Sequence, residues 1–286
     1  MRVVATTLAV GVGLATPALA IAQSAVFDPA GTGRGAGLNG AGVALVGDAG
    51  AIFANPAGIA TVRHIALEGE YNTNAPGTRQ YTGAFAWRLR QFDFGAGVRY
   101  LNDTGTDRDV LGVGTLIYRF GMIAFGGSGK VLRSRQGVIE EQGTSADLGL
   151  AIAVFDIMAL GFAVQNVGGN WDDQSALAMP GLTRVGFTMN YVDPQETFRL
   201  LSTVELQWAE GRGMRTVLGF EGGIVVANAL GVIGRAGYGS RPDGLLQPRL
   251  TYGVTLALTR ASFDYAFEPG VEGVSSVQRV GMRLTL

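Results

Sequence analysis

Cysteine is absent from this 286-residue chain, and histidine occurs once, as His64. Without cysteine there is no disulfide, no thiolate nucleophile, no Cys-ligated metal site and no lipid anchor on cysteine. Charged residues make up only 16% of the chain, whereas ordinary globular domains carry about 25%. The formal net charge of −1 argues against a nucleic-acid partner.

Long hydrophobic runs are also missing beyond the first segment. No stretch of roughly 20 apolar residues follows residue 22, so a membrane protein built from spanning helices is excluded. Yet glycine is abundant, with 45 residues, and the mean hydropathy is positive. A membrane-spanning β-barrel fits this combination, because it distributes its apolar surface over alternate residues of many strands.

The first 22 residues have the pattern of a secretory signal. Arg2 supplies a positive charge, residues 3–15 supply an apolar region, and Ala18-Leu19-Ala20 or Ala20-Ile21-Ala22 supplies a small-x-small cleavage site. The alternative is that this segment forms the first helix of the fold. We expect residues 1–22 to be a cleaved signal peptide and the protein to reach the cell outer membrane.

From about residue 62 onward, apolar and polar residues alternate. In residues 92–100, Phe92, Phe94, Ala96, Val98 and Tyr100 alternate with Asp93, Gly95, Gly97 and Arg99. Successive side chains of a strand point to opposite faces, so such a strand has one apolar and one polar face. The segments run for about ten residues, which is the length of a spanning strand rather than of an ordinary sandwich strand.

We expect about fourteen such strands, and hence a closed antiparallel transmembrane barrel over residues 62–286. Because lipid offers no partner for backbone groups, the last strand must pair with the first. The connections alternate between tight turns and longer loops, of which 133–144 and 167–181 are the longest. The expected strands are 62–72, 79–89, 92–101, 109–119, 122–132, 145–154, 157–166, 182–191, 197–208, 214–225, 228–239, 248–258, 261–268 and 277–286.

Short turns on the periplasmic side and long loops outside are typical of bacterial barrels. An even strand count then places both ends of the barrel on the periplasmic side. The last strand alternates up to the final residue, which resembles the signal read by the barrel-assembly machinery. Leu286 departs from the aromatic residue with which such signals usually end.

Polar residues of the strands fall mostly on the face directed away from lipid. Arg88, Arg99, Glu205 and Arg235 are the candidate lumen-facing residues among them. They either pair with opposite charges across the lumen and stiffen it, or line a polar path for solute. Both signs are mixed, so no ion selectivity follows.

No set of residues in the sequence suggests catalysis, so we expect neither an enzyme nor a cofactor. His64 lies at the start of the first expected strand, where a polar lumen or interface role is a simpler interpretation than catalysis. Glu140-Glu141 and Asp172-Asp173 lie in expected outer loops. They could bind Ca²⁺ through oxygen ligands, but solvated loop charge is the simpler interpretation, and we expect no metal site.

Residues 23–61 do not alternate, and we expect them to form a plug-like segment in or under the lumen. Its glycine-rich beginning is expected to be flexible, and residues 47–54 are expected to form a short helix. Asn55-Pro56 should end that helix, because the residue before proline is displaced from the helical region. Asn-Pro-Ala-Gly then makes a turn into the first strand.

This segment resembles the amino-terminal signature of the PorV/PorQ family, which is related to FadL-type fatty-acid transporters. The matching residues are 40–44, 48–51 and 55–58, within a motif that covers about twenty-five residues of the chain. The resemblance implies a fourteen-stranded barrel whose amino-terminal residues lie in the lumen or close its periplasmic mouth. The residues assigned to the plug or hatch are Asp48, Asn55, Pro56 and Gly58. They either fix the segment to the barrel wall or allow it to move for a ligand.

Three functions follow as alternatives. A FadL-like barrel would bind or pass hydrophobic or amphipathic small molecules. A PorV-like barrel would serve protein secretion or hold exported proteins at the cell surface, using loops 133–144 and 167–181, where Trp171 and Met179-Pro180 could anchor a partner. The third alternative is a structural barrel. In each case outer-membrane lipids surround the protein.

Overall fold

Fourteen antiparallel strands close into one barrel in the computed structural model, and β1 pairs with β14. The expected fold class and strand number are therefore confirmed. The structure describes residues 30–73, 77–103, 107–154, 157–169, 179–192, 197–210, 213–227, 230–241, 247–271 and 275–286. The strands are β1 (Ile65–Thr73), β2 (Arg79–Leu89), β3 (Phe92–Asn102), β4 (Arg108–Phe120), β5 (Ile123–Gln136), β6 (Ile139–Val154), β7 (Met158–Val167), β8 (Leu182–Val192), β9 (Phe198–Ala209), β10 (Met214–Ala227), β11 (Leu230–Gly239), β12 (Leu250–Leu258), β13 (Ala261–Glu268) and β14 (Val277–Thr285).

The alternation in the sequence becomes an inside and an outside of the barrel. On β3, Asp93 and Arg99 are 1% and 2% exposed, whereas Phe94 between them is 37% exposed. The same contrast holds along the other strands, so polar side chains point inward and large apolar side chains point outward. Soluble proteins rarely expose apolar patches of this extent, so the exterior suits hydrocarbon.

Aromatic side chains gather at two levels of the outward face. Near the turns that join odd to even strands, Tyr81 packs against Tyr71 and Tyr100, with ring centroids 5.2 and 6.3 Å apart. Near the opposite end, Trp87 packs against Phe94 at 5.7 Å, and Phe92 against Tyr118 at 5.3 Å. Two such aromatic levels flank the apolar band of membrane barrels. Within the described part of the chain, no helix is long and apolar enough to cross a membrane.

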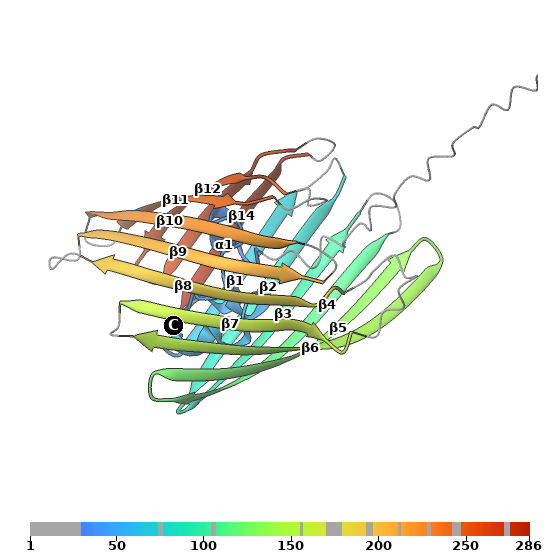
Figure 1. Ribbon diagram of the computed structural model, residues 1–286. Helices are drawn as coiled ribbons and strands as arrows, with labels where there is room; N and C mark the ends of the chain where they lie inside the picture. The colour runs from blue at the N-terminus through green and yellow to red at the C-terminus, as the bar shows by residue number, and fades with distance from the viewer. Residues whose placement is uncertain are drawn as a thin grey trace, which may run out of the picture.

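The two ends of the barrel are distinguished by what they carry. At the termini end β1 begins and β14 finishes, and the Leu286 backbone N–H donates to the Ile65 carbonyl oxygen at 2.9 Å. At the other end, here called the hairpin end, turns lead from odd-numbered to even-numbered strands. There β5 and β6 extend beyond their neighbours (Figure 1). The expected loop 133–144 is thus wrong, because only Gly137 and Val138 separate these two strands. Alternation persists here, with exposed Arg133 and Arg135 flanking buried Ser134.

Two loop assignments change as a result. Glu140 and Glu141 lie on β6 rather than in a solvated loop. In the other long connection, Met179 is only 6% exposed and packs in the luminal cluster that contains Ile52 and Phe53, so it is not an exposed anchor. Trp171 and Asp172-Asp173 lie outside the described residues.

Residues 30–64, here called the luminal segment, lie inside the barrel (Figure 1). Their glycine-rich beginning is not an open coil but a helix, α1 (Gly33–Gly37), because the Thr32 hydroxyl accepts from the Gly35 backbone N–H at 3.1 Å and the barrel wall encloses it. The expected helix 47–54 is a 3₁₀-helix, η2 (Ala49–Phe53). A further 3₁₀-helix, η3 (Pro56–Thr61), replaces the expected turn, so β1 begins at Ile65 rather than at residue 62.

Candidate functional site: the luminal segment and the rim pocket

The luminal segment runs from the hairpin end to the termini end. Near the hairpin end, the Asn39 side-chain amide donates to the Pro248 carbonyl oxygen at 3.1 Å, beside the beginning of β12. Near the termini end, the segment leads into β1 at Ile65. Residues 30–45 and 49–60 are all buried, so the segment occupies the space that an open pore would need.

Asn55 fixes the middle of this segment to the wall. Its side-chain amide donates to the Val43 carbonyl oxygen at 2.7 Å and to the Leu150 carbonyl oxygen on β6 at 3.1 Å. Its side-chain oxygen accepts from the Ala57 backbone N–H at 2.9 Å, which caps η3. The backbone of Asn55 is extended, with φ −153°, as expected before Pro56. One fully buried amide therefore joins two parts of the segment to the barrel.

Asp48 lies between two guanidinium groups. Arg34 of α1 approaches one carboxylate oxygen at 2.9 Å, and Arg283 of β14 binds the other. Burial disfavours the charged form of Asp48, but attraction by Arg283 and Arg34 outweighs burial and holds the pKa of this carboxyl below its ordinary value. Asp48 thus stays ionised and ties α1 to the wall.

Arg34 continues this network across the lumen. Its Nη2 and Nε atoms lie 2.9 and 3.0 Å from the two carboxylate oxygens of Glu221 on β10. Arg235 of β11 shares Glu221, with Nε 2.6 Å from Oε2, and its Nη1 lies 3.3 Å from Asp264 on β13. Burial opposes the charge on Arg34, but Glu221 and Asp48 raise the pKa of its guanidinium above the ordinary value.

Glu205 binds the segment in a second place. One oxygen accepts from the backbone N–H groups of Gly42 and Val43 at 2.7 and 2.9 Å. The other oxygen lies 2.6 Å from Arg184 Nε on β8, and Arg184 Nη2 donates to the Gly40 carbonyl oxygen at 2.6 Å. The Arg184–Glu205 ion pair of the barrel wall therefore binds the backbone of residues 40–43.

Two further arginines of the expected lumen-facing set lie beside the segment. Arg99 Nη2 donates to the Gly31 carbonyl oxygen at 2.7 Å, and its guanidinium carbon lies 4.0 Å from the centre of the Phe53 ring. Arg88 is half-buried near the termini end, where Nη1 donates to the Val62 carbonyl oxygen at 3.4 Å. Arg88, Arg99, Glu205 and Arg235 all contact the luminal segment or its ion-pair network, which favours a holding role over a polar path.

Glycines of the wall allow the segment to approach closely. A Cβ atom at Gly126 would lie 2.7 Å from the backbone of Pro56 and Ala57. At Gly149, Gly161 and Gly237 a Cβ would overlap Asn55, Val43 and Leu38, respectively. Inside the segment, a Cβ at Gly58 would lie 2.6 Å from Ala51 Cβ. These glycines admit the backbone of the segment where any side chain would displace it.

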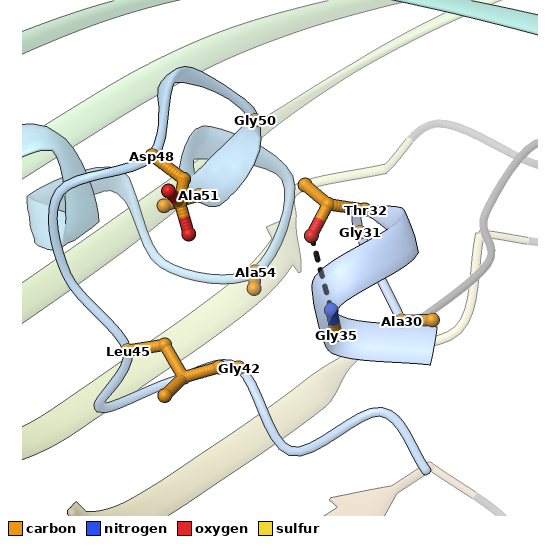
Figure 2. A pocket seen from close by; sticks show the side chains of 10 residues that line it. All are labelled: Ala30, Gly31, Thr32, Gly35, Gly42, Leu45, Asp48, Gly50, Ala51 and Ala54. Carbon is orange, nitrogen blue, oxygen red and sulfur yellow. Dashed lines mark hydrogen bonds between the residues drawn. The ribbon is translucent and has the colours of Figure 1, made fainter. Parts of the chain in front are cut away.

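The remaining space along the segment is small. A cavity of about 10 Å³ lies between α1 and the loop that carries Asp48, and Figure 2 shows the segment folded around it. A second cavity of about 20 Å³ lies beside Asn39 and Arg215. Each cavity has room for about one water molecule, so neither can hold an organic ligand.

A larger pocket lies at the termini end, on the side of the barrel formed by β9–β12. Its volume is about 270 Å³, and most of its lining is apolar. It combines inward residues of the lumen mouth with outward residues of the rim, and Arg199 is its one charged residue. This rim pocket is lined by Thr197, Phe198, Arg199, Gly223, Ile224, Val225, Gly231, Ile233 and Ala257.

Arg199 is held at the edge of the rim pocket and still reaches solvent. Its Nη2 lies 3.5 Å from Glu221, and its side chain is 43% exposed. Its Nε donates to the Asn190 side-chain oxygen at 3.3 Å. A guanidinium beside apolar walls can bind the acidic group of an amphipathic molecule.

Sequence reasoning missed Arg34, because a glycine-rich run was expected to be flexible. One signal could have found it: Arg34 is the only charged residue between Gly31 and Gly47. The rim pocket was also missed, because it depends on which strand ends meet at the rim. His64 is exposed before β1, and its carbonyl oxygen accepts from the Arg88 backbone N–H at 2.8 Å.

No family model and no curated protein sequence matches this chain. Solved barrels are similar in fold. A Pseudomonas aeruginosa FadL homologue is 11% identical, with 89% of this chain and 98% of that chain covered and a TM-score of 0.58. The Pseudomonas putida toluene transporter TodX is 11% identical, with coverages of 88% and 96% and a TM-score of 0.59. A TodX deltaS2S3 mutant, described as a monoaromatic hydrocarbon channel, is 10% identical, with coverages of 88% and 97% and a TM-score of 0.60. This chain therefore has the fold of FadL-type barrels.

Proposed function

We propose that this chain is an outer-membrane barrel of the FadL-like PorV/PorQ type that binds hydrophobic or amphipathic small molecules and passes them across the outer membrane. Residues 1–22 act as the export signal, and residues 23–61 form the plug. The apolar exterior with its two aromatic levels supports the placement in a bilayer. The fold shared with the FadL homologue and TodX supports the transport class.

One observation carries the proposal: the luminal segment occupies the lumen while an apolar pocket of about 270 Å³ stays open at the rim. An occupied lumen excludes ions and sugars, which need a wet path. The rim pocket accepts a small apolar body instead, since Gly223, Gly231 and Ala257 leave room between its larger side chains. The site thus selects against polar solutes.

The wall beside the rim pocket is irregular. The register between β10 and β11 shifts between Val225 and Ala227, where a β-bulge interrupts the pairing. Ile224, Val225 and Val226 are all more than half exposed there. Bulges disrupt the ladder locally, so this is the place where an apolar molecule exchanges between the pocket and the surrounding lipid.

Uptake of a small apolar molecule tests this proposal. Cells that display the wild-type barrel should accumulate radiolabelled toluene faster than cells without it. Ile233→Trp fills the pocket and should remove most of the increase. Val254→Trp is the matched control. Val254 lies on the neighbouring strand β12, next to the residue that pairs with Ile233, but its side chain is on the outward face and does not line the pocket. Equal uptake by both variants and the wild type would rule out the rim pocket.

One observation favours the alternative role in secretion or surface attachment. The tip of the β5–β6 hairpin carries two apolar residues, Val138 at 95% and Ile139 at 61% exposed. Mass spectrometry of material that co-purifies with the barrel separates the two roles. A small lipid-like molecule supports transport, and an exported protein lost from Val138→Ser/Ile139→Ser supports attachment.

A further inference from the structure

Four arginines gather on the outward face at the hairpin end. In the sheet register, Arg108 of β4 lies directly opposite Arg135 of β5, and Arg133 lies opposite Val110. Arg79 of β2 continues the same row, because both Arg79 and Arg108 pair with Asn102 of β3. All four arginines are exposed. They form a cationic patch, defined here as Arg79, Arg108, Arg133 and Arg135.

Fewer negative than positive charges lie at this patch: Glu140 of β6 is opposite Arg135 in the sheet register, and Glu141 lines the adjoining groove. Arg135 lies 3.8 Å from Glu140, and both side chains are well exposed, at 48% and 74%. Within the described residues, Arg79, Arg108 and Arg133 form no ion pair. Like charges directly opposite each other destabilise a strand pair, so the Arg108–Arg135 pairing gains from an anion placed between the two guanidinium groups.

The patch borders a groove of about 500 Å³, lined by Arg108, Val110, Arg133, Ser134, Arg135, Glu140, Glu141 and Gln142. Directly below it on the outward face lies the apolar exterior. Tyr81 and Tyr100 are one outward position below Arg79 and Asn102, and Val110 and Val131 follow Arg108 and Arg133 toward the barrel middle. Tyrosines of this kind mark the boundary between hydrocarbon and headgroups, so the cationic patch lies at headgroup level.

We infer that the cationic patch is a binding site for the phosphorylated headgroup of an outer-leaflet lipid, whose acyl chains lie along the apolar wall below. Arg108, Arg133 and Arg135 supply planar guanidinium groups, which bind phosphate oxygens in pairs. The occupant is a lipid rather than free phosphate, because the groove is open and continuous with the apolar exterior. This inference rests on the bilayer placement in the proposed function, with the termini end of the barrel on the periplasmic side as the sequence predicts, and adds a site outside the transport route.

The test measures lipid retained by the folded full-length barrel. Wild-type protein is reconstituted in phosphatidylcholine vesicles that contain lipid A with its phosphates, or the same lipid A after their removal. After extraction into detergent, native mass spectrometry counts bound lipid A. We expect the wild type to retain the phosphorylated form. The double variant Arg108→Gln/Arg133→Gln should retain about tenfold less of it than the wild type, or still less.

Arg241→Gln is the matched control, since Arg241 is exposed beyond β11 and outside the patch. Arg241→Gln should retain phosphorylated lipid A like the wild type. With dephosphorylated lipid A, the double variant and the wild type should retain equal amounts. Should the double variant fail to fold, the single variant Arg133→Gln gives the comparison. Equal retention of phosphorylated lipid A by the wild type and by a folded patch variant, Arg108→Gln/Arg133→Gln or Arg133→Gln, overturns the site, as does full displacement of lipid by excess inorganic phosphate. Failure of the wild type to insert into vesicles would instead contradict the proposed function.

Discussion

Arg34 on α1 donates two hydrogen bonds to Glu221 on β10, from Nη2 to Oε1 at 2.9 Å and from Nε to Oε2 at 3.0 Å. Both side chains are almost fully buried, at 8% and 2% exposed. Breaking a buried pair by removing one partner is costly because the other charge stays buried. The pair is therefore a main attachment between the luminal segment and the barrel wall.

Replacing Arg34 by Met should weaken that attachment. Glu221 retains Arg235, whose Nε lies 2.6 Å away, so we expect a loss at the lower end of the range for broken buried pairs, about 3 kcal/mol. Urea unfolding of the barrel in lipid vesicles measures it. Arg241→Met, at an exposed position, should leave the midpoint unchanged. An unaltered midpoint for Arg34→Met would show that the pair does not stabilise the fold.

Asp48 sets how the attachment responds to acid. Its pKa is held below the ordinary value in the folded barrel, so its contribution to stability is fully present above the unfolded pKa of about 4 and is lost as the pH falls through the lowered folded pKa. The part of the protease protection that depends on Asp48, measured as the difference between the wild type and Asp48→Asn, should be constant from neutral pH to about pH 5 and should decline only in stronger acid. In Asp48→Asn this acid-dependent part should disappear. A decline centred near neutral pH would contradict the assignment.

Gly237 tests the close approach of the segment to the wall. A Cβ there would overlap the Leu38 carbonyl carbon and the Asn39 nitrogen, which are backbone atoms and cannot turn aside. Gly237→Ala should therefore displace the segment and make it more accessible to protease. Gly114→Ala is the matched control, because nothing lies within 4 Å of its added Cβ. Identical cleavage of the two variants would mean that the segment does not need this glycine.

Arg199 should separate amphipathic from neutral ligands. Its guanidinium is at the edge of the rim pocket, whereas the walls are apolar. We expect Arg199→Gln to weaken binding of a medium-chain carboxylate by about tenfold or more, since a charged hydrogen bond contributes about 1.5–3 kcal/mol. Toluene binding should be little changed. Isothermal titration of both ligands to the detergent-solubilised barrel checks this, and parallel losses would indicate a general collapse of the pocket.

The barrel could be predicted from the sequence because its signal is local and repeated. Alternation such as that of residues 92–100 predicts which side chains face lipid, and the same pattern recurs along each strand. The β5–β6 hairpin was misjudged for a related reason. Alternation continues through Arg133, Ser134 and Arg135, but the polarity of these residues suggested a loop, because both faces are polar once the strands leave the apolar band.

The luminal segment was less predictable because tertiary contacts determine it. Five residues with three glycines would not form α1 alone; the wall supplies the enclosure, and Glu70 accepts from the Gly33 backbone N–H. Asn55-Pro56 did indicate a break after η2. That Asn55 also binds Leu150 on β6 depends on a partner 95 residues away in the chain, which no local pattern states.

Planar-bilayer conductance tests the central claim that residues 30–64 close the barrel. We predict no steady ion conductance for the wild type and steady pores for a variant that lacks residues 31–60. Should that deletion fail to fold, Arg34→Ala/Asp48→Asn/Asn55→Ala, which loosens the three main attachments but keeps the chain length, should show frequent openings. Steady conductance by the wild type, equal to that of either variant, would contradict the claim.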